Sequence, residues 1–235
     1  PFCAVIVATV RGLKWHGGVE VKDLSDKNND SIIKGSENLI NAIKIVSKYG
    51  LRSVVAINLF PEDKKEEIDI IKKICIENNS IAIESDGFAK GGEGMIDLAE
   101  YITSLDESDR DISLLYEDQD SPINKVETLA KEIYSAKKVL WGPMTRTTLR
   151  QFENQGWNFP ICMAKTHLSV SANPKLRGAP EGHTIPIREA RVLGGAKQIV
   201  TLAGDIITLP GLPSSPNAFD IDLNDDGEII NILST

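Results

Sequence analysis

Short apolar runs alternate with amphipathic stretches along the first part of the chain. The apolar runs are rich in β-branched side chains, which is typical of strands buried in a sheet, and they occupy residues 3–9, 54–57 and 81–83. Stretches with helical spacing of apolar side chains lie between and after them: Leu39 to Val46, Ile68 to Cys75 and Gly94 to Tyr101. This alternation predicts a parallel sheet covered by helices.

Turn and capping residues set the expected ends of these elements. Gly17-Gly18 interrupts the chain after the first strand. Residues 22–36 are polar, and Lys27 to Asp30 within them mark a loop. Pro61, followed by Glu62 and Asp63, is expected to open the second helix. Proline fits the first turn of a helix, and acidic side chains are favoured at its positive end.

The second half of the chain has a different order of elements. Helical spacing covers residues 123–133 and 144–156. Apolar runs expected to be strands occupy residues 161–164, 185–192, 199–202 and 206–209, with a long loop at 166–186. We therefore predict an α/β fold, with part of a parallel sheet flanked by helices in a domain at residues 1–105 and a smaller α/β region at residues 106–235.

Near the end of the sequence, Asp226-Gly227 stands between two apolar positions, Ile221 and Ile229. An Asp-Gly pair is typical of a tight hairpin turn. The stretch that begins at Asp222 also fits the first half of a calcium-binding loop, but Leu233 stands where such a loop requires a bidentate Glu. We therefore expect a hairpin and no metal site here.

The first strand is expected to be buried on both faces, because Val5, Ile6 and Val7 are all β-branched. Such a strand needs neighbours on both sides, and the sequence begins at Pro1 without an initiator Met. We expect the chain to be the later part of something longer: a fragment of a complete enzyme, one chain of a split enzyme, or a stand-alone remnant. We then expect either a second polypeptide packed along the open edge of the sheet or a protein that aggregates when it is made alone.

Composition narrows the class of protein. Of the 235 residues, 41% are hydrophobic and 26% are charged, which is ordinary for a globular protein, and the net charge is -8. This acidic balance argues against nucleic acid and anionic membranes as partners, and no apolar run is long enough to cross a bilayer. The cysteines form no Cys-x-x-Cys pair and the histidines lack ligand spacing, so we expect no metal site and a cytoplasmic, reducing location.

The candidate binding residues follow the ends of the predicted strands. Ligands usually bind at this edge of a parallel sheet. Phe60 follows the second strand, and Phe88 follows the third at the start of a glycine-rich stretch that runs to Gly94. Two flat rings at neighbouring strand ends can hold a flat heterocycle, and glycines let backbone N–H groups approach an anionic ligand. Each half has a structural alternative, since a Phe after a strand is usually core and a glycine pair is usually a turn.

Several segments, taken in order, point to a known family. Residues 8–18 resemble the pattern A-T-V-R-A-L-K-x-H-G-G, with Gly12 at the second Ala. Residues 55–61 and 89–94 resemble V-A-I-N-x-F-P and A-K-G-G-E-G, and further similar segments are Met163 to Thr166, Pro174 to Pro180, Val192 after Arg188-Glu189, and Thr208 to Pro213. Together they resemble the formate–tetrahydrofolate ligases (10-formyltetrahydrofolate synthetases). The resemblance runs from end to end of the chain, and the ordered set is far more specific than any one segment.

The resemblance implies an ATP-dependent reaction in which formate attacks ATP to give formyl phosphate, and N10 of tetrahydrofolate then takes the formyl group. The folate-binding residues that it implies are Phe60, Pro61, Phe88, Lys90, Gly91, Gly92 and Glu93, and the nucleotide-side candidates are Thr9, Arg11, His16 and Asn58. Phe60 and Phe88 would form a sandwich around the folate ring system. The family usually has Trp where this chain has Phe88, which predicts weaker stacking on folate.

The resemblance also implies partners and substrates. These are ATP with magnesium, tetrahydrofolate, a monovalent cation and further copies of the chain in a homo-oligomer, typically a homotetramer. Residues 1–105 would be the end of a P-loop-type nucleotide-binding domain. The phosphate-binding lysine and the formyl-phosphate arginine are expected outside this chain, in an amino-terminal phosphate-binding-loop segment from the same gene or a separate chain, because no G-x-x-x-x-G-K-[ST] motif occurs here.

Two functions from different classes follow from these observations. In the first, the chain is the folate-binding portion of the ligase and is inactive when isolated. In the alternative, it is a non-catalytic folate-binding or scaffolding module that lacks the ATP-binding half.

Overall fold

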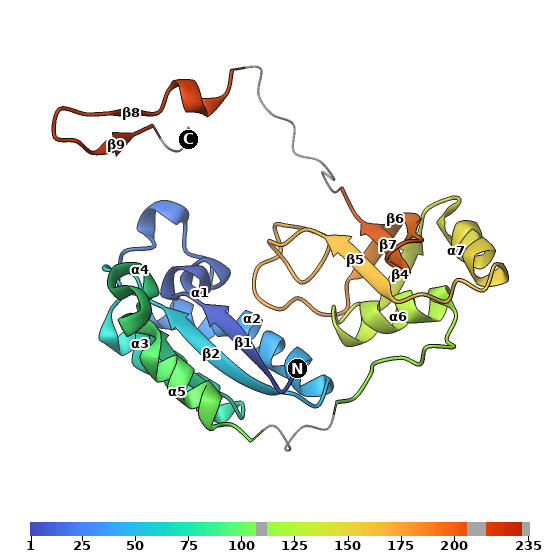
Figure 1. Cartoon of the computed structure of the whole chain (residues 1–235), viewed down its shortest axis with the longest axis horizontal. Coiled ribbons are helices and arrows are strands. Elements are labelled where there is room, and N and C mark those ends of the chain that lie inside the picture. The colour runs from blue at the N-terminus through green and yellow to red at the C-terminus, as the bar shows by residue number, and fades with distance from the viewer. Residues whose placement is uncertain (107–111, 206–214, 232–235) are drawn as a thin grey trace. The chain divides into compact units, whose positions relative to one another are not determined.

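The computed structural model describes residues 1–106, 112–205 and 215–231 (Figure 1). The chain divides into two compact units, Pro1–Asp205 and Ile206–Thr235, and each is described by itself. The first unit holds two sheets with their helices, which confirms the predicted α/β class. The predicted domain division at residues 1–105 and 106–235 stays a prediction.

Three parallel strands form the first sheet, in the order β1 (Cys3–Ala8), β2 (Arg52–Asn58) and β3 (Ile81–Ser85). All three strands were predicted. The helices of this part of the chain are α1 (Val10–His16), η1 (Val21–Asp23), α2 (Asn29–Lys48), α3 (Lys65–Glu77), α4 (Gly87–Lys90), η2 (Gly91–Met95) and α5 (Ile96–Ser104). The three predicted helices are confirmed as the bodies of α2, α3 and α5.

The central strand β2 contributes side chains to two cores. Val55 and Ile57 belong to the core that α1, α2 and α3 cover on one face of the sheet. Val54 and Ala56 point to the other face, where they pack against Leu98 of α5. This two-sided burial explains why β2 is a continuous apolar run in the sequence.

Helix α2 begins at Asn29, earlier than the sequence indicated, so the loop expected at residues 27–30 is wrong for its last two residues. The Asn28 side chain accepts a hydrogen bond from the Ser31 N–H at 3.0 Å and caps the helix. Gly35 packs directly against α1, and a Cβ there would lie 1.8 Å from the Leu13 carbonyl oxygen. The face toward α1 is built from small and polar residues, and it therefore lacks the apolar spacing that reveals a buried helix.

The second predicted helix begins later than expected, at Lys65. Phe60 and Asp63 form a turn before it, with the Asp63 N–H donating to the Phe60 carbonyl oxygen at 3.0 Å. Pro61 lies in this turn and not in the first turn of the helix. The expectation that Pro61 opens the helix is therefore wrong, because a turn that Phe60 and Asp63 close precedes the helix.

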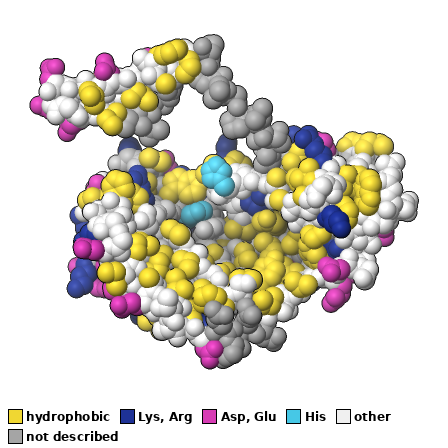
Figure 2. Space-filling model, in the orientation of Figure 1, with side chains coloured by type: hydrophobic (Ala, Val, Ile, Leu, Met, Phe, Trp, Pro, Cys, Tyr) yellow, Lys and Arg dark blue, Asp and Glu magenta, His cyan; other side chains and the backbone are white. Residues whose placement is uncertain are grey.

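Among the residues that the structure describes, strand β1 lies at an edge of the first sheet and pairs with β2 alone. The expectation of burial on both faces is wrong for the described residues, since Val5 is 42% and Val7 is 68% exposed. Both valines lie on the face that α5 covers over β2 and β3, and α5 does not reach them. Apolar side chains gather on the face of the molecule that carries β1 in Figure 2.

Four strands form the second sheet, in the order β4, β6, β7 and β5, with β6 and β7 antiparallel and the other pairs parallel. The elements of this part are α6 (Pro122–Glu132), β4 (Lys138–Trp141), α7 (Thr145–Asn154), β5 (Ile161–Lys165), β6 (Thr184–Leu193) and β7 (Gln198–Ala203). Both predicted helices and three of the predicted strands are confirmed. Strand β4 was missed, because it is four residues long and none of its residues is fully buried.

The second unit contains a short helix η3 (Asn217–Phe219) and the antiparallel strands β8 (Asp222–Leu223) and β9 (Ile229–Ile230). The Asn224 N–H donates to the Glu228 carbonyl oxygen at 2.9 Å, which closes the turn around Gly227. This confirms the predicted hairpin. The expected strand at residues 206–209, the family-like segment from Thr208 to Pro213, and Leu233 lie outside the described residues.

Candidate functional site

The carboxyl ends of β1, β2 and β3 meet at one edge of the first sheet. The register pairs Ala8 with Ile57 and Asn58 with Ser85, so the segments that follow leave the sheet together. The Leu59 N–H donates to the Ser85 carbonyl oxygen at 3.0 Å and extends this pairing beyond the strand ends. Asn58, a nucleotide-side candidate, is the last residue of β2.

Phe60 lines a pocket at this edge. Its ring is half-buried, and the guanidinium carbon of Arg11 lies 5.4 Å from the ring centroid. The pocket has a volume of about 160 Å³ and is lined by Arg11, Val21, Leu24, Ser25, Phe60, Glu62 and Asp63. Arg11 packs on the Phe60 ring and forms no ion pair with any residue in the described part of the chain.

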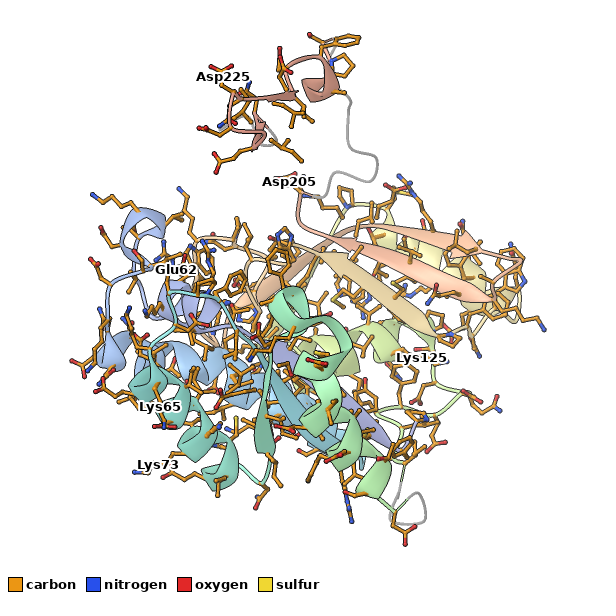
Figure 3. The ribbon with its side chains drawn as sticks, turned by 60° about the vertical axis from the view of Figure 1, so that its left-hand side comes forward. Glu62, Lys65, Lys73, Lys125, Asp205 and Asp225 are labelled. Carbon is orange, nitrogen blue, oxygen red and sulfur yellow. The ribbon has the colours of Figure 1, made fainter. Side chains whose placement is uncertain are left out.

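Asp63 is held against the backbone of Phe60 by two hydrogen bonds. The Phe60 N–H donates to Asp63 Oδ2 at 2.9 Å, and the Asp63 N–H donates to the Phe60 carbonyl oxygen. This turn carries Glu62, which Figure 3 labels, and sets the Asp63 side chain in the pocket wall. Burial raises the pKa of the Asp63 carboxyl, although the Phe60 N–H and the Lys14 ammonium act to lower it.

Sequence reasoning placed Asp63 at a helix start and missed its position in the pocket. One signal could have found it: Asp63 is an acidic residue three positions after a candidate stacking ring. The local sequence is the same whether Asp63 caps a helix or lines a pocket. The observed turn shows that it lines the pocket.

Phe88 lies on α4, and its side chain is 97% exposed, so it belongs to none of the hydrophobic cores. The Phe60 and Phe88 rings do not contact each other among the described residues. The sandwich of these two rings around a ligand therefore stays a prediction.

The glycine-rich stretch folds into a closed loop. The Asp86 N–H donates to the Gly94 carbonyl oxygen at 3.0 Å, and a Cβ on Gly94 would lie 2.2 Å from the Asp86 carbonyl oxygen. Gly91 has a φ of +58°, a backbone conformation that residues other than glycine rarely adopt. The Lys90 ammonium lies 3.1 Å from the Asp86 carboxylate, within the same loop. The remaining predicted folate-side residues, Pro61, Gly92 and Glu93, are exposed.

Two of the nucleotide-side candidates make contacts that hold the fold. Thr9 caps α1, its Oγ1 accepting a hydrogen bond from the Gly12 N–H at 3.0 Å. His16, at the end of α1, accepts a hydrogen bond on Nδ1 from the Gly178 N–H at 3.2 Å. Burial lowers the pKa of His16, and the positive charge of Arg177 lowers it further.

Arg177 anchors the loop between β5 and β6 to the end of α1. Its guanidinium carbon lies 4.6 Å from the centroid of the Trp15 ring, and Nη1 donates to the carbonyl oxygens of Trp15 at 3.2 Å and Val19 at 3.1 Å. Asn38 of α2 donates to the Gly178 carbonyl oxygen at 3.1 Å. The local pattern could not reveal this anchor, because Arg177 and Trp15 are 162 positions apart.

The described residues contain no group of three or more His, Cys, Asp or Glu side chains that could hold a metal ion. Within that same part of the chain, no helix has the length and apolar character needed to cross a membrane. The pocket beside Phe60 therefore carries the strongest candidate chemistry, since an aromatic ring, a cation and a fixed carboxyl group surround it.

Comparisons with known proteins give one consistent result. A family model described as "Formate--tetrahydrofolate ligase" matches residues 1–233. Proteins with that name from Pelagibacter ubique (strain HTCC1062) and Sinorhizobium medicae (strain WSM419) are each 43% identical over 231 residues, or 97% of this chain and 41% of the relative. The one from Zymomonas mobilis is 41% identical over 235 residues, 99% of this chain and 42% of the relative. The chain thus spans about two fifths of the length of these curated relatives.

Proposed function

The chain belongs to the formate–tetrahydrofolate ligase family, and we propose that it supplies the folate-binding part of an ATP-dependent enzyme that joins formate to tetrahydrofolate. The product would be 10-formyltetrahydrofolate, made by way of formyl phosphate. The observation that carries the proposal is the pocket at the carboxyl edge of the first sheet, where Phe60 offers a ring beside the fixed carboxyl of Asp63. Ligands bind at this edge in open parallel sheets.

The folate side of the proposed site consists of Phe60 and the glycine-rich loop that carries Phe88. The Phe88 ring is exposed and would stack on one face of a flat ligand, and Gly91 and Gly92 leave open space beside the loop backbone. A ligand sandwiched by both rings needs centroids about 7 Å apart, twice the contact distance between carbon atoms. Pro61, Lys90 and Glu93 would border the same ligand.

The nucleotide side of the proposed site begins at Arg11. Its guanidinium borders the Phe60 pocket, so it can donate to an anionic group carried by ATP or formyl phosphate. Thr9 and His16 would shape this side through the backbone N–H groups that they hold, and Asn58 would border it from the end of β2. Magnesium would arrive with the ATP phosphates, and a monovalent cation is also expected. The described residues offer no cluster of ligands for a metal ion, so we assign no step to one on this chain.

Phosphoryl transfer needs placed cations and a cradle of backbone N–H donors. We propose that a further segment, from the same gene or a separate chain, provides this cradle together with the phosphate-binding lysine and the formyl-phosphate arginine. The open edge of β1 and the exposed Val5 and Val7 are where such a segment can add strands and cover the sheet. The complete enzyme would be a cytoplasmic homo-oligomer.

A second candidate function is a non-catalytic folate-binding or scaffolding module. The observation that favours it is the absence of a G-x-x-x-x-G-K-[ST] motif from the sequence. The two candidates differ in one respect, because only the enzyme part should gain activity when a phosphate-binding segment is supplied.

The test measures formate-dependent ADP release in the presence of ATP, magnesium, formate and tetrahydrofolate. We expect no release by the 235-residue chain alone, and release after addition of the amino-terminal part of the Pelagibacter ubique relative. In that mixture, Phe60→Ala should raise the KM for tetrahydrofolate, whereas Phe219→Ala, which removes an 80% exposed ring on the second unit, should not. Steady ADP release by the chain alone contradicts the division of roles, and folate binding without any rescue favours the scaffolding module.

A further inference from the structure

Asp63 has a position and a chemistry that the family-based set of folate residues does not use. It lines the same pocket as Phe60, and its carboxyl group is fixed to the Phe60 backbone. We propose that Asp63 recognises the 2-amino-pyrimidinone edge of the pterin ring and so determines which folates the chain accepts. This inference rests on the proposed function, namely that the chain binds tetrahydrofolate.

The first argument is geometric. The Phe60 N–H holds Asp63 Oδ2 at 2.9 Å, and the Asp63 N–H holds the Phe60 carbonyl oxygen at 3.0 Å. A ligand ring beside the Phe60 side chain therefore meets a carboxyl group whose position is set by the same short turn. Recognition groups held in this way lose little freedom when a ligand binds.

The second argument is hydrogen-bonding capacity. An ionised carboxylate has about four acceptor sites, and the Phe60 N–H occupies one of them. In the described part of the chain, no cationic side chain forms an ion pair with Asp63. Lys14, which affects Asp63 through its charge, directs its three donors to Leu24 O at 3.1 Å, Asp26 O at 2.9 Å and Glu67 Oε1 at 2.8 Å. Asp63 therefore keeps acceptor capacity for a ligand.

The third argument is chemical fit. The pyrimidinone ring of a pterin carries an exocyclic 2-amino group next to the N3–H, so two N–H donors point in parallel from one edge. A carboxylate pairs with two parallel N–H donors, as it does with the guanidinium of arginine. The remaining wall includes the apolar side chains of Val21 and Leu24, which suit the faces of a flat ring.

The fourth argument is size. Pockets that enclose a whole drug-sized ligand have volumes of about 300–1,000 Å³. The pocket beside Phe60, at about 160 Å³, is suited to one ring system and not to the whole of a folate with its aminobenzoyl-glutamate tail. It is therefore the end of the site that would receive the pterin.

The test uses the full chain and isothermal titration with two ligands, tetrahydrofolate and its 2-deamino-2-methyl analogue. The analogue keeps the ring and the N3–H but lacks the amino group. We expect the wild-type chain to bind tetrahydrofolate ~10- to 100-fold more tightly than the analogue, because the loss leaves a charged acceptor unpaired. Asp63→Asn should lower the affinity for tetrahydrofolate by a similar factor and should no longer discriminate between the two ligands.

The matched control is Asp69→Asn, which makes the same change to an exposed carboxylate on α3 that does not line the pocket. It should keep the wild-type affinity and the wild-type preference for tetrahydrofolate. Equal binding of both ligands by the wild-type chain overturns the inference and leaves the proposed function standing, and so does full discrimination by Asp63→Asn. A wild-type chain that binds neither ligand overturns the proposed function, and the inference falls with it. The comparison of ligands on the wild-type chain does not depend on whether Asp63→Asn folds.

Discussion

Lys14 and Glu67 form an ion pair inside the first unit, with Nζ 2.8 Å from Oε1 and only 2% and 0% of the two side chains exposed. The same Glu67 oxygen accepts the Asn28 N–H at 2.8 Å, and Lys14 donates to two carbonyl oxygens of the segment before α2. The pair therefore ties α1, the start of α2 and α3 together. Both charges are buried, and removal of either one would leave the other buried without a counter-charge.

Glu67→Gln should destabilise the chain by about 3–5 kcal/mol, because it leaves the Lys14 ammonium buried without its counter-charge. Urea unfolding followed by circular dichroism measures the change. The control is Glu66→Gln in the same turn of α3, where the carboxylate pairs with Lys27 and the two side chains are 65% and 48% exposed. That change should cost less than about 1 kcal/mol. Equal effects of the two substitutions would show that the buried pair has no special role.

Gly35→Ala should destabilise the contact between α1 and α2. The new Cβ would lie 1.8 Å from the Leu13 carbonyl oxygen, so the two helices must separate, at a cost of about 1–3 kcal/mol or more. Alanine otherwise favours a helix over glycine by about 1 kcal/mol, so a stabilised variant would contradict the close contact. Gly195→Ala is the control for thermal unfolding, since nothing lies within 4 Å of its Cβ position and its φ is not positive.

His16 should make stability depend on pH in one direction. Burial, and then Arg177, lower the pKa of the folded His16 below that of the unfolded chain. Below about pH 6.5 the unfolded state therefore binds more protons at His16 than the folded state does. The contribution of the neutral His16 to the free energy of unfolding is complete above that pH, and it is lost as the pH falls toward the folded pKa.

The measurement compares the free energy of unfolding between about pH 7 and pH 5 for the wild-type chain and His16→Asn. Asn keeps an oxygen that can accept the Gly178 N–H but does not titrate, so the variant should lose less stability on acidification. His183, whose pKa is also lowered by burial, titrates in both proteins and cancels in the difference. Identical pH profiles would exclude His16 as the titrating group.

Lys165 should react with amine-acylating reagents at a lower pH than an ordinary exposed lysine. Burial lowers the pKa of its ammonium to about 8, and Nζ lies 5.3 Å from the centroid of the Tyr134 ring. At pH 8 about half of Lys165 would be uncharged, whereas an ordinary lysine with a pKa of about 10.4 is almost fully charged. Labelling with a trace of acetic anhydride across a pH series, read by mass spectrometry, should give a midpoint near 8 for Lys165. Lys73 of α3, an exposed lysine in Figure 3, is the reference, and a shared midpoint would contradict the prediction.

The sequence was most informative where burial follows a regular period. The strand that runs through Val54 and Ile57, and the helix that carries Ile68 and Ile71, were predicted because a sheet buried on both faces requires a continuous apolar run and a covering helix requires its own spacing. The positions of Phe60 and Phe88 after strand ends followed from the same pattern. Their arrangement around a ligand did not follow, and it remains a prediction.

The sequence was least informative where a contact depends on a backbone path. The start of α2 was missed because Gly35 and Ser36 face another helix through small side chains, and Asp63 was taken for a helix-opening acid because a turn and a cap use the same residue types. In both cases the same residue types are compatible with two different backbone conformations.

By itself, the sequence determined the alternation of strands and helices, the parallel first sheet and the edge of that sheet where the candidate residues lie, because these depend on spacings of a few residues. Only the tertiary structure decided that β1 stands at an edge with Val5 and Val7 exposed, and that Arg177 packs on Trp15 from 162 positions away. Neighbours of that kind are set by the path of the whole chain, and no local periodicity encodes them.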